Sequence, residues 1–249
     1  MAAPHKITTL LFDCDNTLVL SEELAFEACA ELMNEICQAK DVTLSFTGET
    51  LIQEFVGMNF RGMLNKLREE HKDIALSDEE VESYVKKEED AVIAKLKAAL
   101  KPCPGVDAEL EKLAEHKKYH LAVVSSSALR RVKASITKVG QDKFFNGEHV
   151  FSAATSLPTP TSKPDPAIYL HAMEVLGKKA GECVAVEDSK SGTMSATRAG
   201  IKVVGYVGPY PPEKRSEMTK VLSDAGALVV MEDWAEFESC LDKIEAGSV

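Results

Sequence analysis

Two aspartates separated by one residue, Asp13 and Asp15, directly follow a short apolar run at residues 7–12. An ionised carboxylate at the end of a buried strand is costly unless it is paired or binds a metal ion. In an open parallel sheet, the carboxyl ends of the strands form the ligand crevice. The stretch therefore predicts a strand that delivers two acidic groups into a site. The alternative is an ordinary turn, because Asp and Asn favour turns.

Polar side chains also end or follow three further predicted strands. They are Ser125, with Ser126 and Ser127 behind it, Lys163, Glu187 and Asp188. Strand ends of a doubly wound sheet lie beside one another, so we expect these groups to converge on one crevice. Each has a plainer interpretation: a strand-end cap, a solvated loop lysine, or acids that only interact with a helix dipole. Four such groups at four strand ends argue against coincidence.

The residue types in this set suit phosphoryl transfer. Three carboxylates from two strand ends fit a hard cation such as Mg²⁺, which prefers oxygen ligands. A lysine and a hydroxyl can hold a phosphoryl group as donors. An aspartate can act as a covalent nucleophile, and a second acid two residues later can transfer protons to the leaving oxygen and from water.

Alternating helices and strands from Gly105 onward must position these groups. The strands are expected at 120–124, 149–152, 183–186, 201–207 and 228–230, with helices at 106–115, 128–139, 165–176, 189–199 and 213–224 and a final amphipathic helix. Such alternation implies βαβ crossovers and a parallel sheet covered on both faces. We therefore predict an α/β fold with a doubly wound, Rossmann-like parallel sheet that also contains the first strand.

The segment between the first strand and this series has a helical period and no strand signals. Ser21 is a plausible N-cap of its first helix, and Ser77 with Glu80 forms a capping box for its last. We expect a discontinuous α/β core at residues 1–19 and 99–249, and an all-helical cap domain at 20–98. An insert at this place would lie over the crevice as a lid.

Composition excludes several classes of protein. The 249 residues are 45% hydrophobic and carry a net charge of −11, which argues against nucleic acid or an anionic membrane as the main partner. Residues 21–97 hold 18 acidic and 9 basic residues, so most of the charge lies in the helical segment. Six cysteines without regular spacing, no signal-like start and no long apolar stretch predict a reduced, cytoplasmic protein.

Four sequence blocks resemble the haloacid dehalogenase-like hydrolase superfamily. They are Asp13-Cys14-Asp15-Asn16-Thr17, Val123-Val124-Ser125, Lys163-Pro164-Asp165-Pro166-Ala167-Ile168-Tyr169, and Val186-Glu187-Asp188-Ser189 with Gly192 and Ala199-Gly200. The position of the helical insert resembles the subfamily with an α-helical cap after the first motif. That subfamily includes sugar-phosphate phosphatases and β-phosphoglucomutase-like proteins.

The resemblance implies a role for each residue of the site. Asp13 would be the nucleophile and a Mg²⁺ ligand, and Asp15 the general acid and base with its backbone carbonyl on the metal. Thr17 would orient the loop between them. The phosphate would be bound by Ser125, with Ser126 beside it, and by Lys163, and the remaining metal ligands would be Glu187 and Asp188.

The acid at position 15 favours phosphate esters within this superfamily. Its dehalogenases lack an acid two residues after the nucleophile, and its phosphonatases use a cap lysine. An alkoxide leaving group needs a proton, whereas a halide does not, so Asp15 fits an ester substrate.

Substrate specificity is expected to lie in the cap. The loop containing Gly57 and Arg61 looks like the substrate-facing loop of sugar-phosphate members, although Arg61 fits a surface helix residue equally well. Glu22 and Glu23 are candidates for contacts with sugar hydroxyls, but acids are also favoured at a helix N-terminus.

The leading hypothesis is a Mg²⁺-dependent phosphatase of a small phosphorylated sugar or polyol that works through an aspartyl-phosphate. The alternatives are a phosphomutase of the same superfamily and, less favoured, a non-catalytic binding module, for which Asp15 would be unnecessary. We expect a small-molecule partner, no nucleic acid or membrane, and a monomer or weak homodimer.

Overall fold

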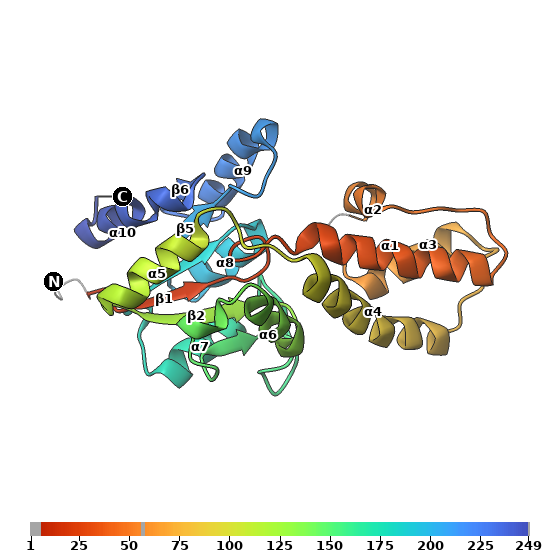
Figure 1. Ribbon diagram of the computed structural model, residues 1–249, viewed down its shortest axis with the longest axis horizontal. Helices are drawn as coiled ribbons and strands as arrows, with labels where there is room; N and C mark the ends of the chain where they lie inside the picture. The colour runs from red at the N-terminus through yellow and green to blue at the C-terminus, as the bar shows by residue number, and fades with distance from the viewer. Residues whose placement is uncertain (1–5, 56–57, 249) are drawn as a thin grey trace. The chain divides into compact units, whose positions relative to one another are not determined.

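The computed structural model of the chain describes residues 6–55 and 58–248, which form two compact units (Figure 1). One unit comprises the described residues up to Leu20 together with those from Lys101 onward. The other unit is Ser21–Leu100. The first unit contains every described strand, and the second contains four helices.

A six-stranded parallel sheet forms the centre of the first unit. Its strands lie in the order β3-β2-β1-β4-β5-β6, and all neighbouring pairs are parallel. They are β1 (Thr9–Phe12), β2 (His120–Ser125), β3 (Val150–Ser152), β4 (Cys183–Glu187), β5 (Lys202–Tyr206) and β6 (Val229–Met231). The chain builds outward from β1 to β3 and then continues on the other side of β1 with β4. This is the doubly wound order, and its switch point lies between β1 and β4.

Helices cover both faces of this sheet, which confirms the predicted fold class. They are α5 (Val106–His116), α6 (Leu129–Lys138), α7 (Ala167–Leu176), α8 (Lys190–Arg198), α9 (Pro212–Asp224) and α10 (Phe237–Ala246), with short 3-10 helices at Asp142–Phe144, Ala180–Glu182 and Trp234–Glu236. Successive strand residues point to opposite faces, so each strand contributes to two apolar layers. Both layers are therefore closed from solvent, as a parallel sheet requires.

The two apolar layers differ in composition. On one face, Leu11 of β1 and Ala185 of β4 share a buried cluster with Tyr169 of α7 and Ala196 of α8. On the other face, Phe12 packs against an aromatic group made of Phe145, Trp234 and Phe237. The face that carries Leu11 and Ala185 also receives the next alternate residues, Asp13 and Glu187, at the carboxyl edge of the sheet.

The second unit packs four helices around its own core. They are α1 (Glu22–Ala39), α2 (Gly48–Glu54), α3 (Phe60–Glu70) and α4 (Asp78–Ala99). Buried apolar residues from α1, α2 and α3, among them Met33, Leu51 and Leu64, form one cluster that is completed by Val81 of α4. The expected absence of strands in this segment holds for its described residues.

Helix starts in this unit show where local sequence decided the structure. The predicted capping box of α4 is present, because the Ser77 side chain accepts from the Glu80 amide and the Glu80 carboxylate accepts from the Ser77 amide. Ser21 does precede α1, but its side chain makes no cap hydrogen bond because its backbone is already helical (φ −100°, ψ −20°). The described residues include no helix that is both long and apolar enough to cross a membrane.

Candidate active site

The loop after β1 is tightly folded at the switch point of the sheet. The Asp13 amide donates to the carbonyl of Val186 on β4, 3.0 Å away, so the first acid is fixed at the end of the strand pair. The Cys14 carbonyl accepts from the amides of Leu18 and Val19 at 3.0 and 3.1 Å. Asn16 adopts the left-handed conformation (φ 56°), which Asn tolerates better than most residues.

Lys163 connects three strand ends through its ammonium group. Its Nζ lies 2.5 Å from Asp13 Oδ1, 2.8 Å from the Val124 carbonyl and 2.7 Å from Glu187 Oε1. An ammonium has three donors, so these acceptors account for all of them. The Lys163 side chain is only 4% exposed, and its backbone amide donates to Ser126 Oγ. The loop lysine is thus a buried member of the site.

Burial sets the proton affinities of the Asp13–Lys163 pair. Loss of water raises the pKa of the Asp13 carboxyl to about 7; Lys163 opposes this shift, and the charges of Glu187 and Asp15 add to it. Burial by itself would lower the pKa of Lys163, but the charges of Asp13 and Glu187 outweigh it and leave that pKa above its usual value. Both groups therefore hold a proton more tightly than they would in water, Asp13 because of its burial and Lys163 because of the two carboxylates beside it.

Glu187 is fully buried and held on one side only. Its Oε1 accepts from Lys163 and from the Tyr169 hydroxyl through a short hydrogen bond. Its Oε2 has no hydrogen-bond partner among the described residues. A Cβ at Gly192 in the first turn of α8 would collide with this carboxylate, so glycine is required there for Glu187 to fit.

Three buried acids form a candidate metal centre. Carboxylate oxygens of Asp13, Glu187 and Asp188 lie within 4.8 Å of one another. The unpartnered Oε2 of Glu187 and the hard oxygen donors fit a divalent cation such as Mg²⁺. The loop after β5 supports the third acid, since the Tyr210 hydroxyl donates to the backbone carbonyl of Asp188 at 3.2 Å.

Asp15 is turned to different partners from those of Asp13. Its Oδ2 accepts from Ser127 Oγ at 2.7 Å and lies 3.5 Å from Ser125 Oγ, and its Oδ1 is 3.3 Å from a guanidinium nitrogen of Arg131. The side chain is 28% exposed, more than that of Asp13. The two acids therefore occupy distinct environments, one buried beside a lysine and one at the edge beside an arginine and two hydroxyls.

The turn after β2 supplies the hydroxyl groups of the site. Ser125 Oγ accepts from the Ser127 amide at 3.0 Å, which curls the turn over the strand end. Ser152 of the neighbouring β3 donates to the Ser127 carbonyl at 2.7 Å and holds the turn from the side. The turn leads directly into α6, which begins at Leu129.

The remaining predicted residues are Thr17, in the loop after β1, and the four residues expected to contact the substrate. The Thr17 hydroxyl is buried and makes no hydrogen bond to any described residue. Glu22 and Glu23 are exposed in the first turn of α1. Arg61, on α3, pairs with Glu82 of α4, and Gly57 lies outside the described residues.

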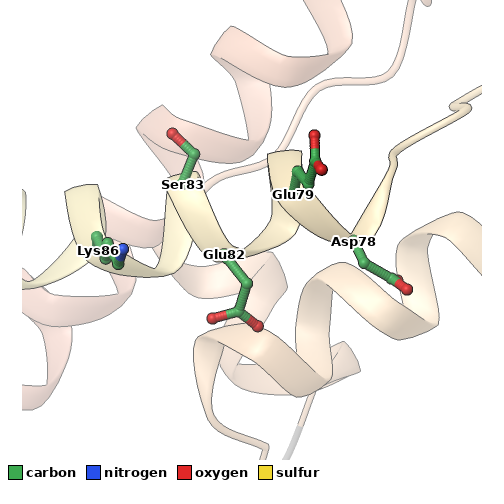
Figure 2. Close-up of a pocket in the computed structure, with 5 residues that line it drawn as sticks. All are labelled: Asp78, Glu79, Glu82, Ser83 and Lys86. Atoms are coloured by element: carbon green, nitrogen blue, oxygen red, sulfur yellow. The ribbon is translucent and has the colours of Figure 1, made fainter.

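The helical unit also carries a surface hollow on α4, which Figure 2 shows. Its lining residues are Asp78, Glu79, Glu82, Ser83 and Lys86. Their side chains spread to different sides of the helix and do not converge (Figure 2). Asp78 and Glu82 are each ion-paired with an arginine of α3, which is the behaviour of a solvated helix face.

Sequence reasoning missed two partners of the acids, Arg131 and Tyr169. Arg131 lies in the first turn of α6, six residues beyond Ser125, where no local pattern separates it from a surface arginine. Tyr169 entered the sequence analysis only as the last residue of the motif that begins at Lys163, without a role of its own. Both contacts depend on how a helix packs against the sheet, and a linear pattern does not contain that information.

Comparison with known proteins agrees with this geometry. The family model described as haloacid dehalogenase-like hydrolase matches residues 10–206. The chain belongs to this family, as its motifs predicted, and the expected hydrolase class is confirmed.

Individual relatives and structures are similar over most of the chain. A phosphorylated carbohydrates phosphatase of Thermotoga maritima is 31% identical over 224 residues, which cover 89% of this chain and 93% of the relative. A 6-phosphogluconate phosphatase of Escherichia coli is 26% identical over 204 residues, covering 80% and 81%. The crystal structure of a haloacid dehalogenase-like protein from Agrobacterium tumefaciens superposes with a TM-score of 0.74 at 28% identity and covers 96% of this chain and 99% of that one.

Proposed function

We propose that the protein is a Mg²⁺-dependent phosphatase that hydrolyses a small phosphorylated sugar or polyol through an aspartyl-phosphate on Asp13. The observation that carries this proposal is the buried contact between Lys163 and Asp13 beside the acids Glu187 and Asp188. A binding module has no need for a buried carboxylate paired with a lysine at the end of the first strand. The names of the Thermotoga and Escherichia relatives support a phosphorylated carbohydrate as substrate.

In the first step, an Asp13 carboxylate oxygen attacks phosphorus and the bond from phosphorus to the ester oxygen breaks. Asp15 in its protonated form gives its proton to the leaving oxygen, which departs as an alcohol. In the second step, Asp15 takes a proton from water as that water attacks phosphorus. Asp13 leaves as a carboxylate, inorganic phosphate is released, and Asp15 is protonated again.

The residues around this reaction manage its negative charge. Asp13, Glu187 and Asp188 would hold Mg²⁺, with the Asp15 carbonyl as a further ligand, and the ion would offset repulsion between nucleophile and phosphate. Lys163 would transfer one of its hydrogen bonds from a carboxylate to a phosphate oxygen. Ser125, with Ser126 beside it, would donate to the others, and Thr17 would support the loop between the two acids.

The helical segment at residues 20–98 is proposed as a cap that sets specificity over the α/β core. Its concentration of acidic residues favours a small substrate over a polyanionic macromolecule. We propose Glu22, Glu23, Gly57 and Arg61 as residues that contact the substrate beyond its phosphate. All six cysteines are buried and none is in a disulfide, which supports a cytoplasmic protein. We propose a monomer or weak homodimer.

Replacing the nucleophile tests the proposal. Asp13→Asn removes the attacking charge with almost no change of shape, so release of phosphate from an aryl phosphate should fall at least 1,000-fold, about 4 kcal/mol in barrier height. Circular dichroism should show an unchanged fold. Retained turnover in this variant, or full turnover of the wild type in excess chelator, would contradict the mechanism.

A phosphate-release screen over sugar, polyol and nucleotide phosphates with Mg²⁺ identifies the substrate class. We expect the best kcat/KM with a sugar or polyol phosphate. Formation of an isomeric hexose phosphate without release of phosphate would instead establish the phosphomutase alternative. No turnover across the whole screen would favour the binding module.

A further inference from the structure

Beyond the metal ligands themselves, the buried face of α7 contains a group that the proposed reaction does not use. The Tyr169 hydroxyl donates to Glu187 Oε1, and the tyrosine is fully buried among the apolar residues that pack on β1 and β4. Burying a phenol hydroxyl is costly unless it is hydrogen-bonded, so its position against a carboxylate is a specific feature. The Lys163 ammonium lies over the same ring, 5.4 Å from its centre.

We propose that Tyr169 is a positioning residue for the metal centre, which holds Glu187 in its ligating orientation. This inference rests on the proposed Mg²⁺-dependent function and adds a residue to it. Tyr169 and Lys163 both donate to Oε1 of Glu187, and Gly192 leaves room beside Oε2. The carboxylate is thereby oriented with one oxygen saturated and the other left for a cation or a cation-bound water.

The two groups that donate to Glu187, Lys163 and Tyr169, behave differently when a phosphate binds. Lys163 already uses its three hydrogens, so it must release one acceptor when a phosphate oxygen arrives. Tyr169 has a single donor, lies beneath the site, and has no reason to leave Glu187 during the reaction. It is therefore the contact that keeps Glu187 in place while Lys163 changes partners. Groups that orient metal ligands in this way typically contribute 10- to 100-fold to metal affinity.

Tyr169→Phe removes the hydroxyl and keeps the ring. We expect the Kd for Mg²⁺, measured by calorimetric titration of the full chain without substrate, to rise at least tenfold. At saturating Mg²⁺, the loss in kcat should be smaller than the loss in Mg²⁺ affinity, because phenylalanine removes none of the reacting groups. An affinity within twofold of wild type in a folded variant would overturn the inference.

Tyr206→Phe is the matched control. Tyr206 is a buried tyrosine at the end of β5 whose ring packs on Trp234, outside the acid cluster. Removing the Tyr206 hydroxyl should lower thermal stability and leave the Kd for Mg²⁺ unchanged. An equal loss of Mg²⁺ affinity in both variants would show a general effect of core damage and would also overturn the inference.

A double-mutant cycle tests whether Tyr169 acts through Glu187. Once Glu187→Gln has been made, adding Tyr169→Phe should change the Kd for Mg²⁺ by less than twofold, because the residue it positions has been removed. A further tenfold loss would mean that the hydroxyl acts elsewhere. Absence of Mg²⁺ binding by the wild type would instead refute the proposed function.

Should Tyr169→Phe fail to fold, the chain labelled with 3-fluorotyrosine gives the same answer. A fluorine signal that moves between the wild type and Glu187→Gln and is still present in Tyr210→Phe belongs to Tyr169, the tyrosine on that carboxylate. That signal should also move when Mg²⁺ is added to the wild type. No common signal would overturn the inference.

Discussion

Gly192 shows how a single missing side chain shapes the acid cluster. Glu187 and Ala185 point to the same face of β4, the face covered by α7 and α8, so the Glu187 carboxylate is directed beneath the first turn of α8. Only a residue without a Cβ leaves space for it there. Helix propensity would favour alanine at this position, but the space needed by the Glu187 carboxylate requires glycine.

Gly192→Ala should therefore damage the metal centre. The added methyl group displaces the Glu187 carboxylate, so we expect at least a tenfold loss in Mg²⁺ affinity and about 1–3 kcal/mol of overpacking strain. Calorimetric titration and urea unfolding measure the two effects. Gly147→Ala is the control, because a Cβ there meets open space. Unchanged Mg²⁺ affinity in Gly192→Ala would contradict this account of the glycine.

Helices, strands and helix caps were predicted correctly where neighbouring residues in the sequence determine them. Within the described residues of the α/β unit, the apolar periods predicted the strands and the helices between them, with ends that differ from the structure by a few residues. The α4 capping box is present as predicted. Ser21 is a case where the residue type was right and the backbone was not suited to the cap. The contacts of Arg131 and Tyr169 depend on the packing register of α6 and α7 against the sheet, so periodicity could not reveal them.

The cap of α4 gives a prediction at this scale. Ser77→Ala removes the acceptor for the Glu80 amide, so the helical unit should lose about 1 kcal/mol of stability. Urea unfolding followed by circular dichroism measures this loss. Ser83→Ala, in the second turn of the same helix, should leave stability within about 0.5 kcal/mol of wild type. Equal losses in the two variants would mean that the cap contributes nothing specific.

For the whole molecule, the amino edge of the sheet contributes a dependence of stability on pH. His120, which begins β2, faces His149, which precedes β3, with ring centres 5.5 Å apart. Burial, then the charge of Lys178 and then His149 lower the pKa of His120 below its usual 6.5. The unfolded chain therefore binds a proton more readily than the folded chain does, so stability falls as pH drops through 6.5.

His120→Gln should make this fall less steep between pH 7.5 and 5.5. The measurement is the urea midpoint as a function of pH, compared with His116→Gln on the exposed surface of α5. An identical slope in the wild type and His120→Gln would contradict the assignment. The effect should be modest, because the His120 side chain is exposed to solvent, which screens its interactions.

The junction between the two units has a consequence of a different kind. The chain leaves the α/β unit after Leu20 and returns at Lys101, and these residues are joined by a hydrogen bond of 3.0 Å from the Leu20 amide to the Lys101 carbonyl. An antiparallel bridge between Val19 and Pro102 pins the same two ends. The segment Ser21–Leu100 therefore connects two paired stretches of the α/β unit, as the loop of a hairpin does. The entropic cost of closing such a loop grows only slowly with its length. The two chain ends, and the acids near them, are thus held by contacts within the α/β unit itself, so a change in the length of the helical segment should cost that unit little stability.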